Sequence, residues 1–333
     1  MNADWINFLR TSGAHLTEEQ SFVFQPHPSN SVNTLYPITQ LAAVSVTGED
    51  NLLFLQGQLT CNLNEISKNH CRFAAYCNAK GRVISTLLVC KRQDAFILIL
   101  PRSLLEKVTQ KLRLYILRSK VQLQDVSDQL CLLGLKSSET TLDNISLPTD
   151  LCTNNGTETG LIMSKLPGSS NRYLIIDTFD KTKQLWSHTV GSRLITPGDS
   201  NEWDYQDLSA GIPWFGISAS EEYIPQMLNI DKLGGVSFKK GCYVGQEIVA
   251  RTHYLGKAKR ELVLAECCKT AMIDHDTTII DHIAQEPVGK IVAAKRNQHS
   301  CRLLVVMQHE DRPIKQLMLS NSNQDKIDII PFQ

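Results

Sequence analysis

The sequence predicts an α+β protein of two related halves, closed by a small β-barrel or sandwich at the C-terminal end. The first observation is the order of segments between residues 41 and 127: strand, helix, three strands, helix, strand. The second is a weaker version of this order up to residue 257, and the third is a change to short β-like runs beyond residue 258. Helices packed on a mainly antiparallel sheet account for both halves, and short successive strands account for the end.

The elements of the first half are marked by apolar patterns. Residues 41–46 form a short apolar run, and 48–60 have leucines on one helical side with Asp50 near the start. Three further strand-like runs follow, and the turn 78–81 joins the first two of them. A helix is predicted at 103–117, where apolar residues fall at helical spacing and Ser103 is a plausible cap. The three strand-like runs are 71–77, 83–90 and 95–100.

The second half and the C-terminal region are marked less strongly. Strands are predicted at 130–135, 160–164 and 172–177, and a helix at 181–190, while 137–158 has the composition of a loop or a poorly marked helix. Residues 1–35, mixed in character and polar toward their end, are predicted to be an arm laid over the body. The runs that predict the last domain are 261–266, 287–295, 301–308 and 327–332.

Charge and composition exclude several classes of function. The chain has 333 residues, with 34 basic and 34 acidic side chains, so no global field draws it to nucleic acid or to an acidic membrane. Residues 1–19 lack the apolar core of a secretory signal, and the longest strongly apolar run, 95–100, is too short to cross a bilayer. We therefore expect a cytoplasmic protein without membrane contact.

Ten cysteines are scattered along the chain without a CxxC pair. This spacing predicts reduced thiols and no stable metal site.

The stretch KKGCYVGQE, residues 239–247, is the strongest candidate for a functional site. It follows the pair Gly234-Gly235, and helical character begins at Gln246. A glycine-rich approach to a helix start presents backbone N–H groups to an anion, and with the lysine pair it favours the thiolate form of Cys242. Between residues 239 and 260 there are six basic residues and one acid, Glu247. The alternatives are a buried apolar role for the cysteine and a solvated loop for the lysines.

This stretch resembles the KGC(Y/F)xGQE motif of the YgfZ family of folate-binding proteins, which is related to the T-protein (aminomethyltransferase) of the glycine cleavage system. The resemblance extends over roughly residues 35–330. It includes VTGEDNLLFLQGQLTCN, FAAYCNAKGRV and the segment 223–226 before the glycine pair.

The resemblance implies two ferredoxin-like folate-binding domains and a C-terminal β-barrel arranged as a ring. The expected division is an N-terminal arm over 1–35, a first domain over 36–127, a second over 128–257 and the barrel over 258–333. The implied ligand is tetrahydrofolate or a one-carbon derivative. The implied partners are iron–sulfur enzymes such as tRNA methylthiotransferases, with a possible weak contact to tRNA itself.

The resemblance also assigns residues to the site. Trp203 matches one of two folate-stacking tryptophans by its spacing, and the second position corresponds to Leu41, so one stacking wall is aliphatic. Lys240 and Arg251 are candidates for the glutamate tail of folate, and Tyr223 for lining the same region. Core packing is the alternative for Trp203, and a solvated face is the alternative for Lys240.

Five further positions shape the motif around Cys242, which is the candidate working thiolate: Gly241, Tyr243, Gly245, Gln246 and Glu247. Gln246 and Glu247 are expected to satisfy backbone donors and hold the loop. Glu247 is alternatively expected to pair with Arg251, four residues on.

Three positions depart from the T-protein. Ser85 and Thr86 stand where an aspartate pair supplies its catalytic carboxylate, and Ser209 stands where a glutamate holds the pterin. A hydroxyl cannot act as a carboxylate base, so aminomethyl transfer is disfavoured. We therefore expect a folate-binding accessory protein that supports iron–sulfur cluster assembly or repair and thereby tRNA modification. The alternatives are a folate-dependent one-carbon transferase and a non-catalytic scaffold for tRNA or a radical enzyme.

Overall fold

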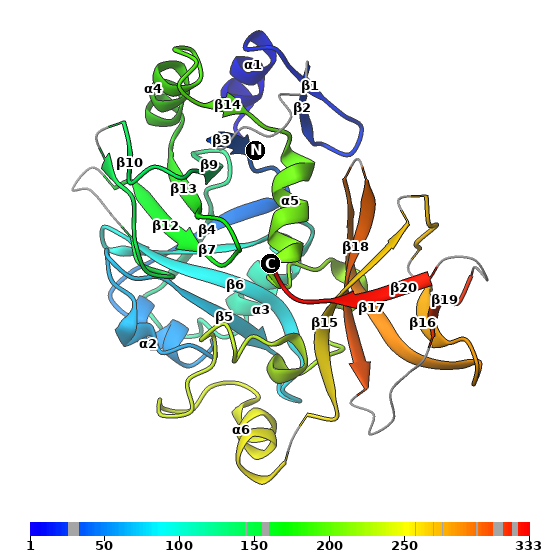
Figure 1. Ribbon diagram of the computed structural model, residues 1–333. Helices are drawn as coiled ribbons and strands as arrows, with labels where there is room; N and C mark the ends of the chain where they lie inside the picture. The colour runs from blue at the N-terminus through cyan, green and yellow to red at the C-terminus, as the bar shows by residue number, and fades with distance from the viewer. Residues whose placement is uncertain are drawn as a thin grey trace.

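The computed structural model describes residues 1–25, 33–143, 145–154, 160–256, 258–268, 270–274, 276–297, 299–308, 316–321 and 326–333. Within these residues the protein has two five-stranded sheets and a closed six-stranded barrel (Figure 1). The predicted α+β class and the C-terminal β-barrel are therefore confirmed.

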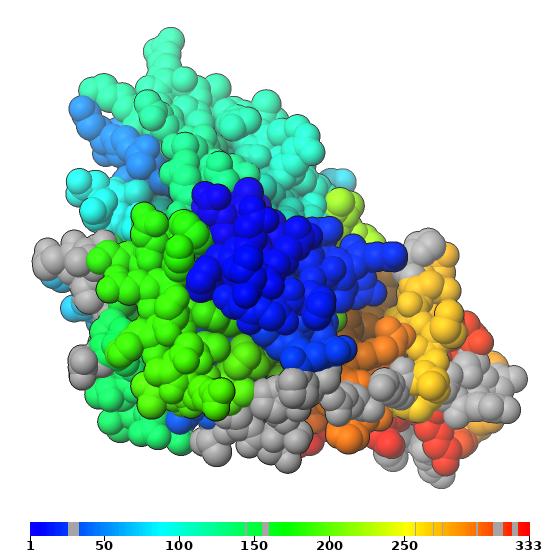
Figure 2. Space-filling view, turned by 90° about the horizontal axis from the view of Figure 1, so that it is seen from above, coloured from blue at the N-terminus to red at the C-terminus, as the bar shows by residue number. Residues whose placement is uncertain are grey.

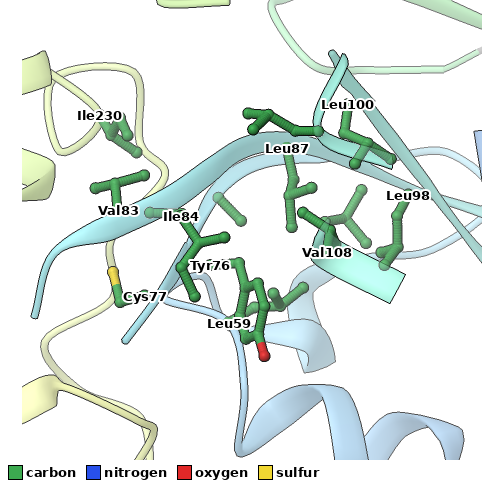
Figure 3. Close-up of a cluster of buried hydrophobic side chains, with 14 of the residues drawn as sticks. Leu59, Tyr76, Cys77, Val83, Ile84, Leu87, Leu98, Leu100, Val108 and Ile230 are labelled. Carbon is green, nitrogen blue, oxygen red and sulfur yellow. The ribbon is translucent and has the colours of Figure 1, made fainter. Parts of the chain in front are cut away.

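The first sheet has the strand order β5-β6-β7-β4-β8, with every neighbouring pair antiparallel. Helices α2 (Asn51–Gln56) and α3 (Leu105–Arg113) cover one of its faces. Figure 3 shows part of that core, where Val108 of α3 lies near Leu98 of the sheet. The strands are β4 (Leu41–Thr47), β5 (Arg72–Cys77), β6 (Val83–Arg92), β7 (Ala95–Pro101) and β8 (Gln122–Asp125).

The second sheet has the order β12-β13-β9-β3-β14, and β3 of this sheet comes from the beginning of the chain. Helix α4 (Phe179–Thr189) packs on its outer face, and α5 (Ser200–Ser209) follows β14 toward the barrel. The strands are β3 (Thr34–Pro37), β9 (Leu130–Lys136), β12 (Ile162–Leu166), β13 (Arg172–Thr178) and β14 (Thr196–Pro197). A two-stranded hairpin, β10 (Thr141–Leu142) and β11 (Ile145–Ser146), lies between β9 and β12 in the chain.

The two sheets pack face to face, and this explains why their strands are apolar on both sides. In β4, Ala43 faces the second sheet while Val44 and Val46 face the helices, and the same alternation runs through β6 and β7. In β9, Leu132 faces the first sheet and Leu133 faces away from it. The two halves therefore form four layers, helix, sheet, sheet and helix, and the inner layers read as nearly continuous apolar runs.

The N-terminal segment packs on the second half and forms part of its outer layer. Helix α1 (Ala3–Thr11) begins after Asn2, whose side-chain oxygen accepts a hydrogen bond from the Trp5 amide at 2.9 Å. The Trp5 ring lies edge-on to that of Trp186 in α4, with 5.7 Å between the centroids. The hairpin β1 (Ala14–Leu16) and β2 (Phe22–Phe24) extends this layer, and Figure 2 shows the segment lying across the later residues of the second half. Apolar residues spaced along residues 1–24 bury this outer face.

The C-terminal barrel closes with the order β15-β18-β17-β16-β19-β20. Alternate side chains point into it and form a separate core. Helix α5 contacts both β17 and β18, so the barrel is fixed to the second half along this helix. The strands are β15 (Arg260–Cys268), β16 (Thr278–Asp281), β17 (Glu286–Arg296), β18 (Ser300–Gln308), β19 (Leu317–Leu319) and β20 (Lys326–Ile330).

A glycine in β9 permits the contact between α5 and the second sheet. A Cβ atom built on Gly134 would lie 2.3 Å from Cε3 of Trp203. We expect Gly134→Ala to lower the free energy of unfolding by about 1–3 kcal/mol, because the core has no room for another methyl group. Urea denaturation measures this. Gly241→Ala is the matched control, since its added Cβ would meet nothing within 4 Å; equal stability of the two variants would contradict the prediction.

Candidate functional site

The segment 234–245, which contains the cysteine motif, is fixed to the chain just after α2. Ser237 donates its amide hydrogen to the Thr60 carbonyl at 2.9 Å, and the Thr60 hydroxyl donates to the Gly235 carbonyl at 2.6 Å. Val244 donates its amide to the carbonyl of Gly57 at 3.2 Å. The motif therefore lies against the first half of the protein, although it is more than 170 residues away in sequence.

Lys240 is the main fastener of this segment. Its Nζ lies 2.7 Å from the carbonyl oxygens of Gln56 and Leu59, and 2.8 Å from that of Cys61. An ammonium group has three N–H donors, and these three acceptors use all of them. Burial lowers the pKa of Lys240 to about 8. Lys240 thus satisfies the carbonyls at and beyond the C-terminal end of α2 and has no N–H group left for a folate carboxylate.

Close backbone approach explains the last glycine of the motif. Gly245 has φ 81°, and an added Cβ would lie 2.4 Å from the Asn78 carbonyl and 2.8 Å from the Cα of Gly81. Helix α6 (Gln246–Leu255) begins directly after it. The side-chain oxygen of Gln246 accepts a hydrogen bond from the Tyr243 amide at 3.3 Å, so Gln246 supports the loop as expected.

Cys242 is exposed at the tip of this fastened segment, whereas eight of the ten cysteines are buried and all ten are free thiols. Its neighbour Tyr243 is buried, and the ring lies 5.2 Å from Nζ of Lys240. Glu247 and Arg251 are both exposed, and within the described ranges they form no ion pair with each other. The arrangement presents one accessible thiol on a rigid base.

A cavity of about 240 Å³ lies where the two halves and the barrel meet. The first half contributes three lining residues, Gln40, Pro101 and Ser103. Helix α5 and the segment after it contribute two aspartates and two aromatic rings, and β17 contributes a lysine. Among the lining residues are Gln40, Ser103, Asp204, Asp207, Trp214, Phe215 and Lys295.

Two polar atoms at this cavity are buried without a protein partner. Asp204 accepts from Nζ of Lys295 at 2.6 Å through Oδ2, but its Oδ1 has no hydrogen-bond partner. Nε2 of Gln40 is also without a partner. Burial raises the pKa of Asp204 to about 6, while the Lys295 ammonium opposes that rise. An orphaned acceptor and an orphaned donor beside one cavity suit a ligand that offers both kinds of group.

The residues predicted for folate lie in several places, with only Trp203 and Leu41 in one cluster. Trp203 is fully buried, with the Arg172 guanidinium 4.3 Å from its ring centroid, and Leu41 is buried in the same apolar cluster between the sheets. Tyr223 is buried in the core of the first half, and Arg251 is exposed on α6. Core packing, the alternative considered for Trp203, is what the structure shows. Gln40 and Asp204, each one residue from a predicted position, line the cavity instead.

The three departures from the T-protein pattern are at buried positions. Ser85 and Thr86 are fully buried in β6, and the Ser85 hydroxyl donates to the Thr86 carbonyl at 2.9 Å. The Ser209 hydroxyl accepts from Nη1 of Arg302 in the barrel at 2.7 Å. These hydroxyl groups offer no carboxylate to a reacting amine.

Two kinds of feature are absent from the described ranges. No helix there is long and apolar enough to cross a membrane. No group of three or more histidine, cysteine, aspartate or glutamate side chains there could hold a metal ion.

Comparison with known sequences gives matches over most of the chain. The profile of the family described as GCVT N-terminal domain matches residues 30–153. The chain is 34% identical over 232 residues to the tRNA-modifying protein YgfZ of Colwellia psychrerythraea, covering 68% of this chain and 70% of that protein. It is also 34% identical over 235 residues to the protein of the same name in Yersinia pestis (strain Pestoides F), covering 69% of each.

A solved structure has the same fold along nearly the whole chain. The glycine cleavage system aminomethyltransferase T from Bartonella henselae superposes with a TM-score of 0.75 over 99% of this chain and 96% of that one. The sequence identity is 11%, so this likeness shows the fold alone.

The role of Lys240 as a fastener leads to a test. We expect Lys240→Met to lower the free energy of unfolding by about 2–3 kcal/mol, because carbonyls would lose a charged donor. The thiol of Cys242 should also react faster with an aromatic disulfide reagent, since its loop would be released.

Lys239→Met is the adjacent control, because Lys239 is exposed and its replacement should change stability by less than about 0.5 kcal/mol. Unchanged stability and thiol reactivity in Lys240→Met would show that the three hydrogen bonds do not hold the loop.

Proposed function

Because this chain belongs to the family of the tRNA-modifying protein YgfZ, we propose that it binds a reduced folate and supports tRNA modification, with Cys242 as its working thiolate. The folate part of the proposal depends on the cavity where the two halves and the barrel meet. Oδ1 of Asp204 and Nε2 of Gln40 are buried beside it without a hydrogen-bond partner. The GCVT domain match over the first half supports the same ligand class.

The cavity fits the pterin ring and not an entire folate. Its volume of 240 Å³ is below the roughly 300–1,000 Å³ of pockets that enclose drug-sized ligands, so the benzoyl and glutamate parts would extend outside. Trp214 and Phe215 supply aromatic surface among the lining residues. A flat, polar-edged ring suits such a lining.

The polar groups of the cavity match the edge of a pterin. The 2-amino and N3–H groups are donors, and Oδ1 of Asp204 is an acceptor without a partner. The 4-oxo group is an acceptor, and Nε2 of Gln40 is a donor without a partner. Lys295 holds the other oxygen of Asp204, which keeps the carboxylate oriented. In this proposal Asp204 and Gln40 replace the stacking pair expected from Trp203 and Leu41.

Cys242 supplies the second part of the proposal. An exposed thiolate can ligate iron or accept a sulfur atom, and Cys242 is one of two exposed cysteines. Within the part of the chain that the structure describes, no three-ligand group exists, so iron at Cys242 would take its remaining ligands from a partner. We propose that the partners are iron–sulfur enzymes that modify tRNA, such as methylthiotransferases, in the cytoplasm.

Aminomethyl transfer is not favoured as the function. The positions that carry the catalytic carboxylate in the T-protein pattern are Ser85 and Thr86, and both are sealed inside β6. Neither can accept a proton as a carboxylate does near neutral pH.

Calorimetric titration with tetrahydrofolate and 5-formyltetrahydrofolate tests the folate site. We expect a micromolar dissociation constant, equivalent to about 8 kcal/mol, and about tenfold weaker binding by Asp204→Asn and by Gln40→Leu. Because the ligand edge donates to an ionised carboxylate, affinity for 5-formyltetrahydrofolate should fall as the pH drops through about 6, the pKa of Asp204.

Asp180→Asn, at an exposed position on α4, should bind both ligands as the wild type does. The pH dependence should disappear in Asp204→Asn. Wild-type affinity of that variant at pH 7.5 would place the pterin elsewhere.

Complementation of a strain that lacks the protein tests the thiolate. We expect Cys242→Ala to leave methylthio-modified tRNA nucleosides at the level of the empty vector, measured by mass spectrometry of digested tRNA. Cys268→Ala, at the other exposed cysteine, should restore them fully. Full restoration by Cys242→Ala would remove the thiolate from the mechanism and leave folate binding standing.

A further inference from the structure

Three aromatic rings form an exposed cluster beside the cysteine motif. The rings of Phe238 and His253 are stacked, with centroids 3.7 Å apart and planes 11° apart. Tyr254 lies edge-on to both, at 4.8 Å from His253 and 6.1 Å from Phe238. His253 is exposed and the Tyr254 residue is 65% exposed. The exposed rings of His253 and Tyr254 leave ring faces and edges open to a ligand.

The cluster is built on fixed backbone. Phe238 lies in the segment that Lys240 and Ser237 fasten to the first half, and the Tyr254 hydroxyl donates to the Phe238 carbonyl at 3.5 Å. Helix α6 is held to the segment before the motif, since Nε2 of Gln226 donates a hydrogen bond to the Val249 carbonyl at 2.7 Å. A platform held in this way loses little conformational freedom when something stacks on it.

Unpaired positive charge surrounds the rings. Lys239 follows Phe238 directly, and Arg251 lies three residues before Tyr254, so it is on the same side of α6. Both are exposed, and neither makes an ion pair with any described residue. Lys232, near His253 through their common neighbour Asp231, pairs with Glu261 at 3.0 Å. The charge excess is therefore local, on a chain whose total charge is zero.

We propose that Phe238, His253 and Tyr254, with Lys239 and Arg251, form a binding site for unpaired nucleotides of an RNA. Open aromatic rings stack on bases that are free of a helix, and neighbouring cations bind the phosphates between them. The inference rests on the proposed function in that tRNA, with its single-stranded loops, is the RNA we expect. An acidic protein surface would use the cations alone and would have no need of the stacked rings.

The position of the cluster suits a large ligand. Figure 1 shows α6 at the lower end of the molecule, on the far side from α1 and α4. Phe238 lies in the same fastened segment as Cys242, His253 and Tyr254 lie on the helix that follows it, and no lining residue of the cavity belongs to the cluster. Folate and RNA would therefore bind at separate places.

Fluorescence anisotropy with full-length protein tests the site. The probes are a labelled RNA hairpin with an unpaired loop and a blunt-ended RNA duplex of the same length. We expect tighter binding of the hairpin, and about tenfold weaker hairpin binding by His253→Ala and by Tyr254→Ala. Lys239→Ala should reduce the slope of log affinity against log salt by about 0.7, the value for one contact to a single strand.

Tyr115→Ala and Arg118→Ala are matched controls, because they remove another exposed aromatic and another exposed cation, and both should bind the hairpin as the wild type does. Equal binding of hairpin and duplex would overturn the proposal. Wild-type affinity of the two ring variants would also overturn it, and loss of binding in Lys239→Ala alone would assign the surface to an acidic partner.

Folate titration of the same variants separates this proposal from the function it rests on. Retained folate binding with lost hairpin binding is the expected result for His253→Ala. If the wild-type protein binds folate but not the hairpin, the nucleotide site alone is disproved. If the wild-type protein does not bind folate but binds the hairpin, and the ring variants lose that binding, the folate site alone is disproved.

Discussion

A single buried guanidinium holds together the parts of the molecule on which the cavity depends. Arg172 of β13 is 2% exposed, pairs with Asp207 of α5, and donates to the carbonyls of Pro167 and Gln206, each at 3.1 Å. It also lies over the Trp203 ring. Burial raises the pKa of Asp207, and the Arg172 charge opposes that rise. Losing one partner of such a buried pair typically costs about 3–5 kcal/mol, because the other charge is left uncompensated.

Helix α5, which Arg172 holds in place, contacts several other parts of the protein. One side packs Trp203 against Gly134 in the second sheet, another directs Asp204 to the cavity and to Lys295, and the end brings Ser209 to Arg302 of the barrel. The barrel and the second half therefore meet along this helix. The cavity walls keep their relative positions because this helix is itself fixed by charge, ring packing and hydrogen bonds.

The sequence patterns predicted most of the sheets for a clear physical reason. Strands such as β6 and β7 are buried on both faces, so their runs of apolar residues stand out from the turns around them. Helix α5 was not predicted, because buried serine, aspartate, tyrosine and tryptophan follow one another along it without a single apolar stripe. The helix and the hairpin within the first 24 residues were not predicted, since both are short and their apolar side chains are spread over two elements.

The candidate site was predictable only where it is local in sequence. The motif around Cys242 is contiguous, so its glycines, its cysteine and its helix start could all be recognised. The cavity takes Gln40, Asp204 and Lys295 from three distant segments, and no spacing pattern connects them. The Lys240 contacts were hidden for another reason: charge suggested an anion partner, whereas the structure supplies backbone oxygens.

That choice of acceptors has a consequence for how the family can vary. Lys240 binds main-chain carbonyls, which every amino acid possesses. The side chains at positions 56, 59 and 61 therefore take no part in its hydrogen bonds. Their constraints come from other contacts, since Leu59 and Cys61 are buried in the core of the first half and the Gln56 side chain accepts from the Leu63 amide at 2.7 Å. The placement of Cys242 thus depends on the side chains of Lys240 and Thr60, but only on the main chain at positions 56, 59 and 61.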